Sequence, residues 1–342
     1  MHVLCYGAGA VGSLVGGRLA IGEAAEVTLL ARRAHVAVIR TRGLAIETPD
    51  GTAVCKHVDS ITSLDDLRSA PDVVVLTVKA YRTSDALADL APVLRGGARL
   101  VTLQNGVGNE ERIADVAGAA CTVSGAVTLS VSLPRPGVVR QNTAGGGVAL
   151  APLEGGRPVS DLVDMFARGG FRVAAYPEYR AMKWSKLLLN MLANATAAVM
   201  DVTPAEIARD PRMFAIDRAA FREAVRVMRA LRLRPVTLPG YPVPLLARVM
   251  AGPAALARLI VGPRLGGGRG EKMPSLWEDL DRGRSDSEVG VLNGAVVREG
   301  ARLGVPTPIN ALVTSALGAL AAGRCDRSVY RRSPEALLTY CP

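Results

Sequence analysis

A chain of 342 residues is too long for one ordinary hydrophobic core, so two domains are expected. Hydrophobic residues make up 49% of the chain, which excludes a disordered protein. The net charge of +10 suits an anionic cofactor and an acidic substrate; aromatic residues are only 4% and do not interleave with basic runs, so no specific nucleic-acid partner is expected.

The first expected strand, residues 2–6, leads directly into the glycine-rich sequence GAGAVG. A GxGxxG turn between a strand and a helix brings backbone N–H groups and a helix N-terminus against a pyrophosphate. The first glycine permits the tight turn, the second lets the phosphates approach, and the third allows close helix packing. The predicted cofactor-binding stretch is therefore Gly7, Ala8, Gly9, Ala10, Val11 and Gly12.

The second expected strand, residues 26–31, supplies a cofactor preference. Its end usually carries an acidic residue that holds the ribose 2′-hydroxyl of NAD. Here the strand is followed by Arg32 and Arg33, and a guanidinium pairs well with a 2′-phosphate. The sequence therefore favours NADP over NAD at Arg32; the alternative is an ordinary solvated basic loop.

The rest of the first half alternates between strands and helices. Strands are expected at 73–78, 99–103 and 121–126, and helices at 11–21, 34–41, 83–94 and 109–117. The Asp50-Gly51 pair predicts a hairpin within residues 44–58. Residues 131–152 indicate further antiparallel strands.

From about residue 178 the pattern becomes helical. Helices are expected at 180–200, 204–209, 212–232, 245–260, 273–282, 286–303 and 308–322, with loops at 233–244 and 262–272. The predicted fold is thus α/β: an N-terminal Rossmann-type dinucleotide-binding domain, residues 1–176, followed by an all-helical C-terminal substrate and catalytic domain, residues 177–342.

Histidines and cysteines narrow the chemistry. The three histidines, His2, His35 and His57, all lie near the N-terminus, so the helical domain contributes no histidine relay. No cluster has metal-ligand spacing, and we expect no metal site. The five cysteines contain no CxxC pair, which fits a reducing cytoplasm. Neither a signal-peptide lead-in nor a membrane-spanning segment is evident.

The expected helix at 180–200 carries a polar stripe on an otherwise apolar sequence. Lys186, Asn190 and Asn194 recur every four residues, which places them on one face. Burying such groups without partners would cost roughly 1–3 kcal/mol each, so the stripe should face a polar cleft or a ligand. A partly buried lysine is also suited to general acid catalysis. The alternative is an ordinary surface stripe.

Four further residues stand at positions where ligands are often bound. Lys79 and Asn105 follow expected strands, at the sheet edge where open α/β sheets bind ligands. Ser275 and Glu288 lie in the late helical region. The simpler readings are a turn with a capping residue for the first two, and an N-cap and a solvated helix charge for the others.

One motif points to another enzyme class. Tyr179 and Lys183 match the YxxxK pair of short-chain dehydrogenases. That class has three residues between the first two glycines of its fingerprint, whereas Gly7 and Gly9 are separated by one. We therefore do not assign Tyr179 and Lys183 a catalytic role of that kind.

Nearly from end to end, the chain resembles the ketopantoate reductases (2-dehydropantoate 2-reductases) of the 6-phosphogluconate-dehydrogenase-like superfamily. The resemblance rests on seven motifs in family order: GAGAVG, VTLLARR, LTVKAYR, LQNGVGNEE, KWSKLLLNMLANA, DLDRGRSDSEVGVLNGAVV and GVPTPINALV. It implies NADPH-dependent reduction of 2-dehydropantoate to (R)-pantoate in pantothenate and coenzyme A biosynthesis.

The resemblance also implies a role for each matching residue. Lys186 matches the catalytic lysine and Glu288 a catalytic glutamate; Asn190, Asn194 and Ser275 match substrate-binding residues; Gly7, Gly9, Gly12, Arg32, Lys79 and Asn105 match cofactor-binding residues. Two departures bear on the substrate. Lys272 stands where some members have a substrate-binding Asn, and Gly290 replaces a frequent Asp.

Two other functions stay open at this point. A paralogue would reduce a different 2-oxo acid or an imine with the same residues. A non-catalytic NADP-binding sensor would use the helical domain for protein contacts. The oligomeric state is also open, with a homodimer as one option.

Overall fold

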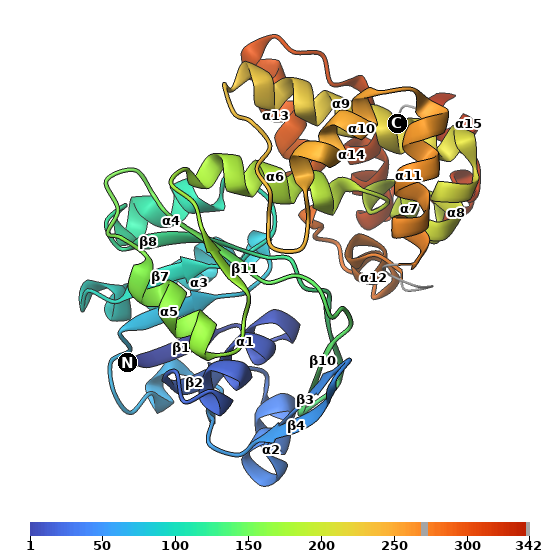
Figure 1. Cartoon of the computed structure of the whole chain (residues 1–342). Helices are drawn as coiled ribbons and strands as arrows, with labels where there is room; N and C mark the ends of the chain where they lie inside the picture. Colours follow the sequence, from blue (N-terminus) through green and yellow to red (C-terminus); the bar gives the residue numbers. More distant parts are fainter. Residues whose placement is uncertain (268–272, 340–342) are drawn as a thin grey trace. The chain divides into compact units, whose positions relative to one another are not determined.

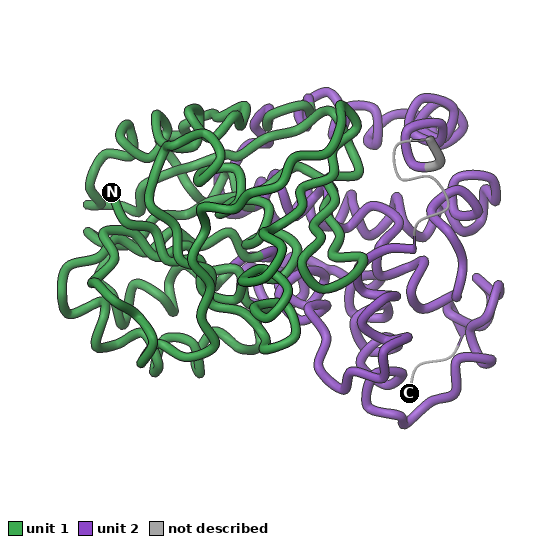
Figure 2. The backbone as a smooth tube through the Cα atoms, turned by 90° about the horizontal axis from the view of Figure 1, so that it is seen from below, with its two compact units in different colours: residues 1–104, 108–183, 238–241 green, residues 105–107, 184–237, 242–342 purple. Residues whose placement is uncertain are grey.

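The computed structural model describes residues 1–267 and 273–339, which form two compact units (Figure 2). Unit 1 comprises residues 1–104, 108–183 and 238–241. Unit 2 comprises residues 105–107, 184–237 and 242–342. The chain therefore leaves unit 1 for a three-residue segment directly after Gln104, and leaves it again after Lys183.

An eight-stranded sheet forms the centre of unit 1 (Figure 1). Its spatial order is β12 (Val173–Ala175), β11 (Val148–Pro152), β8 (Thr122–Val127), β7 (Arg99–Thr102), β6 (Val73–Leu76), β1 (His2–Tyr6), β2 (Glu26–Leu30) and β5 (Asp59–Ile61). The pairs from β8 to β5 are parallel, whereas β11 is antiparallel to β8. Continuous apolar strands such as β6 are typical of a parallel sheet buried on both faces.

Helices cover both faces of this sheet. Alternate residues of β1 point to opposite sides: Val3 and Cys5 belong to one core cluster, Leu4 and Tyr6 to the other. The first cluster includes residues of α1 (Ala10–Ile21) and α5 (Ser160–Arg168), and the second residues of α3 (Thr83–Arg95) and α4 (Asn109–Ala117). Unit 1 also contains α2 (Arg33–Arg42) and the short 3-10 helices η1 (Leu64–Asp66) and η2 (Ala80–Arg82).

A second, four-stranded sheet in unit 1 joins two hairpins. The predicted hairpin is confirmed as β3 (Leu44–Thr48) with β4 (Gly51–Cys55), and residues 131–152 supply the antiparallel pair β9 (Val131–Arg135) and β10 (Val138–Gln141). The parallel pairing of β3 with β10 links the two. The sequence did not predict this link, because the two strands are far apart in the chain.

Unit 2 is helical among its described residues. It contains most of α6 (Tyr179–Met191), followed by α7 (Ala195–Met200), α8 (Pro204–Arg209), α9 (Pro211–Ala230), α10 (Val243–Ala251), α11 (Ala254–Gly267), α12 (Ser275–Asp281), η3 (Glu288–Val291), α13 (Asn293–Leu303), α14 (Pro308–Ala321), η4 (Arg327–Val329) and α15 (Pro334–Thr339). No helix in the described ranges is long and apolar enough to cross a membrane.

Several predicted helices were wrong in extent. The helix expected at 180–200 is two helices, and the one expected at 245–260 is divided at Gly252 and Pro253. The region 286–303 begins as a 3-10 helix, η3. Residues 262–267, expected to be loop, belong to α11, and α15 was not predicted.

The break between α6 and α7 has an identifiable cause. Ala193 adopts a left-handed conformation with φ +46°, and its backbone N–H donates to both carboxylate oxygens of Asp217 at 3.0 Å. Asp217, a buried residue of α9, also accepts from the hydroxyl of Thr196 at 2.6 Å. Because this carboxylate comes from a helix distant in sequence, the periodicity of 180–200 could not reveal the break.

Candidate active site

The fingerprint turn in unit 1 requires glycine at two positions for steric reasons. Gly7 has φ +84°, and a Cβ there would lie 2.4 Å from Cγ1 of Val78. A Cβ at Gly12 would lie 2.5 Å from the hydroxyl of Thr77. At Gly9, which is exposed, the nearest atom to an added Cβ is the carbonyl oxygen of Gly7 at 3.8 Å. The turn is therefore tight on its sheet side and open at Gly9, beside the N-terminus of α1.

A buried histidine braces this turn. His35 Nδ1 accepts from the backbone N–H of Gly137 at 2.9 Å, so Nε2 carries the proton and donates to Ser13 Oγ at 3.0 Å. The Ser13 hydroxyl in turn donates to the carbonyl of Ala8 at 3.1 Å. Burial lowers the pKa of His35, which fits the neutral form that this chain of bonds requires. The sequence placed His35 on a helix but gave it no role.

The predicted cofactor residues of unit 1 follow three neighbouring strands. Gly7 follows β1, Arg32 stands between β2 and α2, and Lys79 lies beyond β6 at the start of η2. Since β2, β1 and β6 are adjacent and parallel, these residues share the carboxyl edge of the sheet. Arg32 is exposed and Lys79 half-buried.

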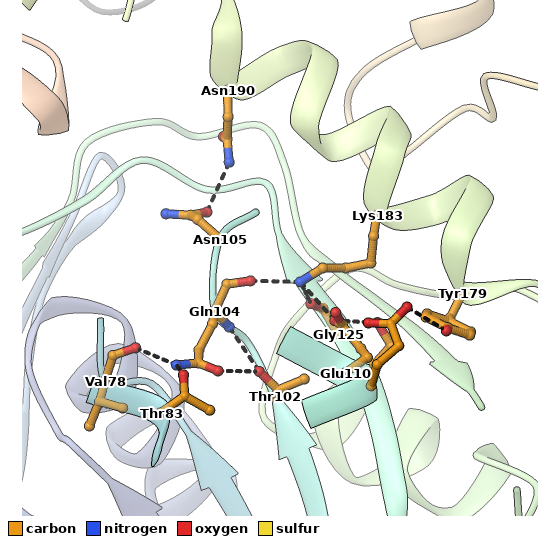
Figure 3. A network of polar contacts seen from close by, with 12 residues as sticks. Val78, Thr83, Thr102, Gln104, Asn105, Glu110, Gly125, Tyr179, Lys183 and Asn190 are labelled. Atoms are coloured by element: carbon orange, nitrogen blue, oxygen red, sulfur yellow. Dashed lines mark hydrogen bonds and ion pairs between the residues drawn. The ribbon is translucent and has the colours of Figure 1, made fainter. Parts of the chain in front are cut away.

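Three asparagines of unit 2 form a chain of amide contacts. Asn190 Nδ2 donates to Asn105 Oδ1 at 3.0 Å (Figure 3). Asn194 Nδ2 donates to the Asn190 carbonyl at 2.9 Å, and its Oδ1 accepts from the backbone of Leu276 at 3.3 Å. The predicted stripe required Asn190 and Asn194 to lie on one helix, and this prediction was wrong. Asn194 directly precedes α7, and its side chain donates to the backbone carbonyl of Asn190 near the end of α6. Leu276 follows Ser275 at the start of α12.

The segment after Asn105 lies against η3, whose first residue is Glu288. The backbone N–H of Val107 donates to the carbonyl of Val291 at 3.1 Å. Gly106 has φ +87°, and a Cβ there would lie 2.5 Å from the same carbonyl oxygen. Glu288 is only 4% exposed, so the reading of a solvated helix charge is wrong. Ser275 is exposed and is not the N-cap of α12; Pro274 holds that position.

Two lysines of α6 have different surroundings. Lys186 is half-buried and lies one turn before Asn190 on the same side of the helix. Lys183 is 2% exposed and forms an ion pair with Glu110 at 3.0 Å, while the Tyr179 hydroxyl donates to Glu111 at 2.9 Å. The YxxxK pair is thus engaged by two consecutive glutamates of α4.

Within residues 1–267 and 273–339, no group of three or more His, Cys, Asp or Glu side chains could hold a metal ion. The cysteines of this part of the chain, Cys5, Cys55, Cys121 and Cys325, are free thiols. Lys272, which the sequence placed at a substrate-binding position, lies outside the described residues.

A strand, a glycine-rich turn and a helix at the edge of a mainly parallel sheet define the class of Rossmann-type dinucleotide-binding proteins. Two family models match the chain: "Ketopantoate reductase PanE/ApbA" over residues 3–155, and "Ketopantoate reductase PanE/ApbA C terminal" over residues 178–321. The protein belongs to the ketopantoate reductase family and is an oxidoreductase.

Curated relatives and solved structures extend this similarity over most of the chain. The 2-dehydropantoate 2-reductase of Pyrococcus horikoshii is 28% identical over 92% of this chain and 95% of its own. The 2-dehydropantoate 2-reductase of Halobacterium salinarum is 34% identical over 67% of this chain and 76% of its own. The crystal structure of a PanE/ApbA family ketopantoate reductase from Ralstonia eutropha JMP134 has a TM-score of 0.78 at 29% identity and covers 95% of this chain and 99% of that one.

A more distant structure shares the fold. D-mandelate dehydrogenase in a ternary structure with NADH and anilino(oxo)acetate has a TM-score of 0.79 at 21% identity, covering 94% of this chain and 99% of that one. This likeness shows a common architecture only.

Proposed function

We propose that this protein reduces 2-dehydropantoate to (R)-pantoate with NADPH, as a step of pantothenate and coenzyme A biosynthesis. The observation that carries the proposal is the amide chain Asn105–Asn190–Asn194 in unit 2, one turn from Lys186. The motif resemblance described in the sequence analysis implies a site role for each of these residues. The proposal places the reaction in the cytoplasm, which the cysteine pattern supports.

The residues of unit 1 fit a dinucleotide. The open side at Gly9 leaves the N-terminus of α1 accessible, where backbone N–H groups and the helix dipole attract a pyrophosphate. Arg32 is exposed at the end of β2, the position suited to a 2′-phosphate, and this supports NADPH over NADH. Lys79 shares the same sheet edge. When bound, the cofactor supplies a hydride to the carbonyl carbon of the substrate.

Lys186 is assigned the proton transfer. Its ammonium donates a hydrogen bond to the ketone oxygen and then a proton as that oxygen becomes an alkoxide, so the interaction is strongest in the transition state. Asn190 and Asn194 hold the substrate through their amides, and Ser275 at the exposed start of α12 binds its carboxylate. Glu288 accepts a hydrogen bond from the substrate hydroxyl.

The test is NADPH oxidation by the purified protein with a panel of 2-oxo acids that includes 2-dehydropantoate. We expect 2-dehydropantoate to give the highest kcat/KM, with (R)-pantoate as the product by chiral chromatography. A higher kcat/KM for another 2-oxo acid or an imine would replace the substrate but keep the reaction. Binding of NADPH without turnover of any carbonyl compound would instead support a sensor.

A further inference from the structure

The buried ammonium of Lys183 has a complete set of acceptors. Its Nζ donates to the backbone carbonyl of Gln104 at 2.6 Å and to that of Gly125 at 3.4 Å, and pairs with Glu110 Oε1 at 3.0 Å (Figure 3). A lysine has three N–H donors, and all three find an acceptor here. Glu110, 1% exposed, also accepts from the hydroxyl of Ser124 at 2.8 Å.

The shortest of these bonds fixes the backbone next to a proposed site residue. Gln104 is the last residue of unit 1 before the segment 105–107, and its neighbour Asn105 accepts from Asn190. The side chain of Gln104 is held as well, since its Nε2 donates to the Val78 carbonyl at 3.0 Å and to Thr83 Oγ1 at 2.9 Å. The direction in which Asn105 leaves the sheet is thus set by Gln104.

Lys183 also precedes the catalytic lysine on its own helix. It is the last residue of α6 within unit 1, and Lys186 follows three positions later. One side chain therefore connects the start of the Asn105 segment with the part of α6 that leads to Lys186. Gln104 and Lys183 are each followed in the chain by residues of unit 2.

Stability alone does not account for a buried lysine and glutamate at this place. Removing two charges from water carries a large desolvation penalty, and replacing such a pair by apolar residues of similar size is often neutral or stabilising. An apolar pair, however, offers no donor to the carbonyl of Gln104. The ammonium supplies backbone bonds that an apolar side chain cannot make, and the bond to Gln104 is shorter than the bond to Gly125.

We propose that Lys183 is a positioning residue: by holding the Gln104 carbonyl it directs Asn105 toward Asn190 and so sets the rate of carbonyl reduction. The inference rests on the proposed function for its kinetic consequence. It assigns no contact of Lys183 with substrate or cofactor. Its effect should be larger on kcat than on the KM for NADPH, because Asn105 is only one of the proposed cofactor contacts, and the fingerprint turn, Arg32 and Lys79 are unchanged.

The main test is the double variant Lys183→Met with Glu110→Gln, which removes the ammonium without leaving a buried unpaired charge. We expect kcat to fall about tenfold, since small misplacement of reacting groups lowers rates strongly, while the KM for NADPH changes less than about threefold. The matched control is Tyr179→Phe, which removes the neighbouring bond to Glu111 and should keep the wild-type kcat. A folded double variant with wild-type kcat would overturn the proposal.

Hydrogen–deuterium exchange separates this inference from the proposed function. In the double variant, peptides that cover residues 103–108 should exchange faster, including the Val107 amide that is bonded to Val291 in the wild type. Unchanged exchange would contradict the positioning role, even if the wild-type protein reduced no 2-oxo acid. If the double variant does not fold, the variant Lys183→Arg tests the positioning role instead. It keeps a charged donor for Gln104, so a kcat within about threefold of wild type is expected, and a tenfold loss at wild-type KM would count against the proposal.

Discussion

The fingerprint turn of unit 1 and the amide chain of unit 2 are built in opposite ways. The turn consists of six consecutive residues, 7–12, and its shape follows from glycines packed against Thr77 and Val78 of one neighbouring segment. The amide chain instead joins two segments far apart in the sequence: Asn105 lies in one, and Asn190 and Asn194 lie in the other. The glycine-rich turn can therefore be recognised from consecutive residues, whereas the contact of Asn105 with Asn190 forms only in the folded chain.

This contrast predicts different consequences of substitution. Changes in the turn should act on folding or cofactor affinity, because the turn is proposed to bind the cofactor through its backbone N–H groups. Changes in the helical unit should act on turnover, because the side chains proposed to carry the chemistry belong to it. Four predictions follow from this separation.

The largest effect is expected for Lys186→Ala. Loss of a general acid usually lowers kcat by ~10²–10⁴-fold, while NADPH affinity should stay within about threefold of wild type. Lys56→Ala, which removes the same charge from an exposed position of unit 1, is the matched control and should leave kcat unchanged. Steady-state kinetics and fluorescence titration of NADPH measure both quantities. A loss in kcat of less than about tenfold would reject the role of Lys186.

Gly7→Ala and Gly9→Ala test the turn itself. Alanine at position 7 must adopt φ +84° against Val78, so we expect the free energy of unfolding to fall by about 2–4 kcal/mol. Alanine at position 9 meets open space and should change stability by less than about 0.5 kcal/mol, yet weaken NADPH binding at least about tenfold. Denaturant titrations and NADPH binding distinguish the two. Equal effects on stability would contradict the steric assignment.

Arg32→Asp tests the proposed cofactor preference. The carboxylate repels a 2′-phosphate and can accept from a ribose 2′-hydroxyl, so the ratio of kcat/KM for NADPH to that for NADH should fall by about tenfold or more. Arg33→Asp, a change of the same charge at the next exposed position, is the control and should alter the ratio less. An unchanged ratio for Arg32→Asp would remove the assignment to the 2′-phosphate.

The smallest effect concerns pH and His35. Burial lowers the pKa of His35 in the folded protein, so folding favours the neutral ring. The stabilisation is present above the unfolded pKa of about 6.5 and is lost as the pH falls from there toward the lowered pKa of the folded state. When the pH falls from about 7.5 to 5.5, the free energy of unfolding should decrease more in the wild type than in His35→Gln. The difference between the two decreases should be at most about 1 kcal/mol. Denaturant titrations at both values check this; parallel losses would contradict it.

Much of unit 1 was predictable because its signals are local. The apolar runs of β1 and β6 and the full extent of α4 follow directly from the sequence pattern. The pairing of β3 with β10 was not predictable, since it depends on two hairpins meeting in space. In unit 2, the break at Ala193 depends on Asp217, which no periodicity of residues 180–200 contains.

The sequence by itself determined the glycine-rich turn and the set of polar residues from which a reductase site can be made, because motif spacing is contained within a few consecutive residues. Only the tertiary structure decided which of those groups meet. It places the Lys183 ammonium against Glu110 and the Gln104 carbonyl, and leaves Lys186, one turn later, half-buried beside Asn190. Lys183 and Lys186 of one helix thus differ in burial, and the acceptors around Lys183 come from residues distant in the chain.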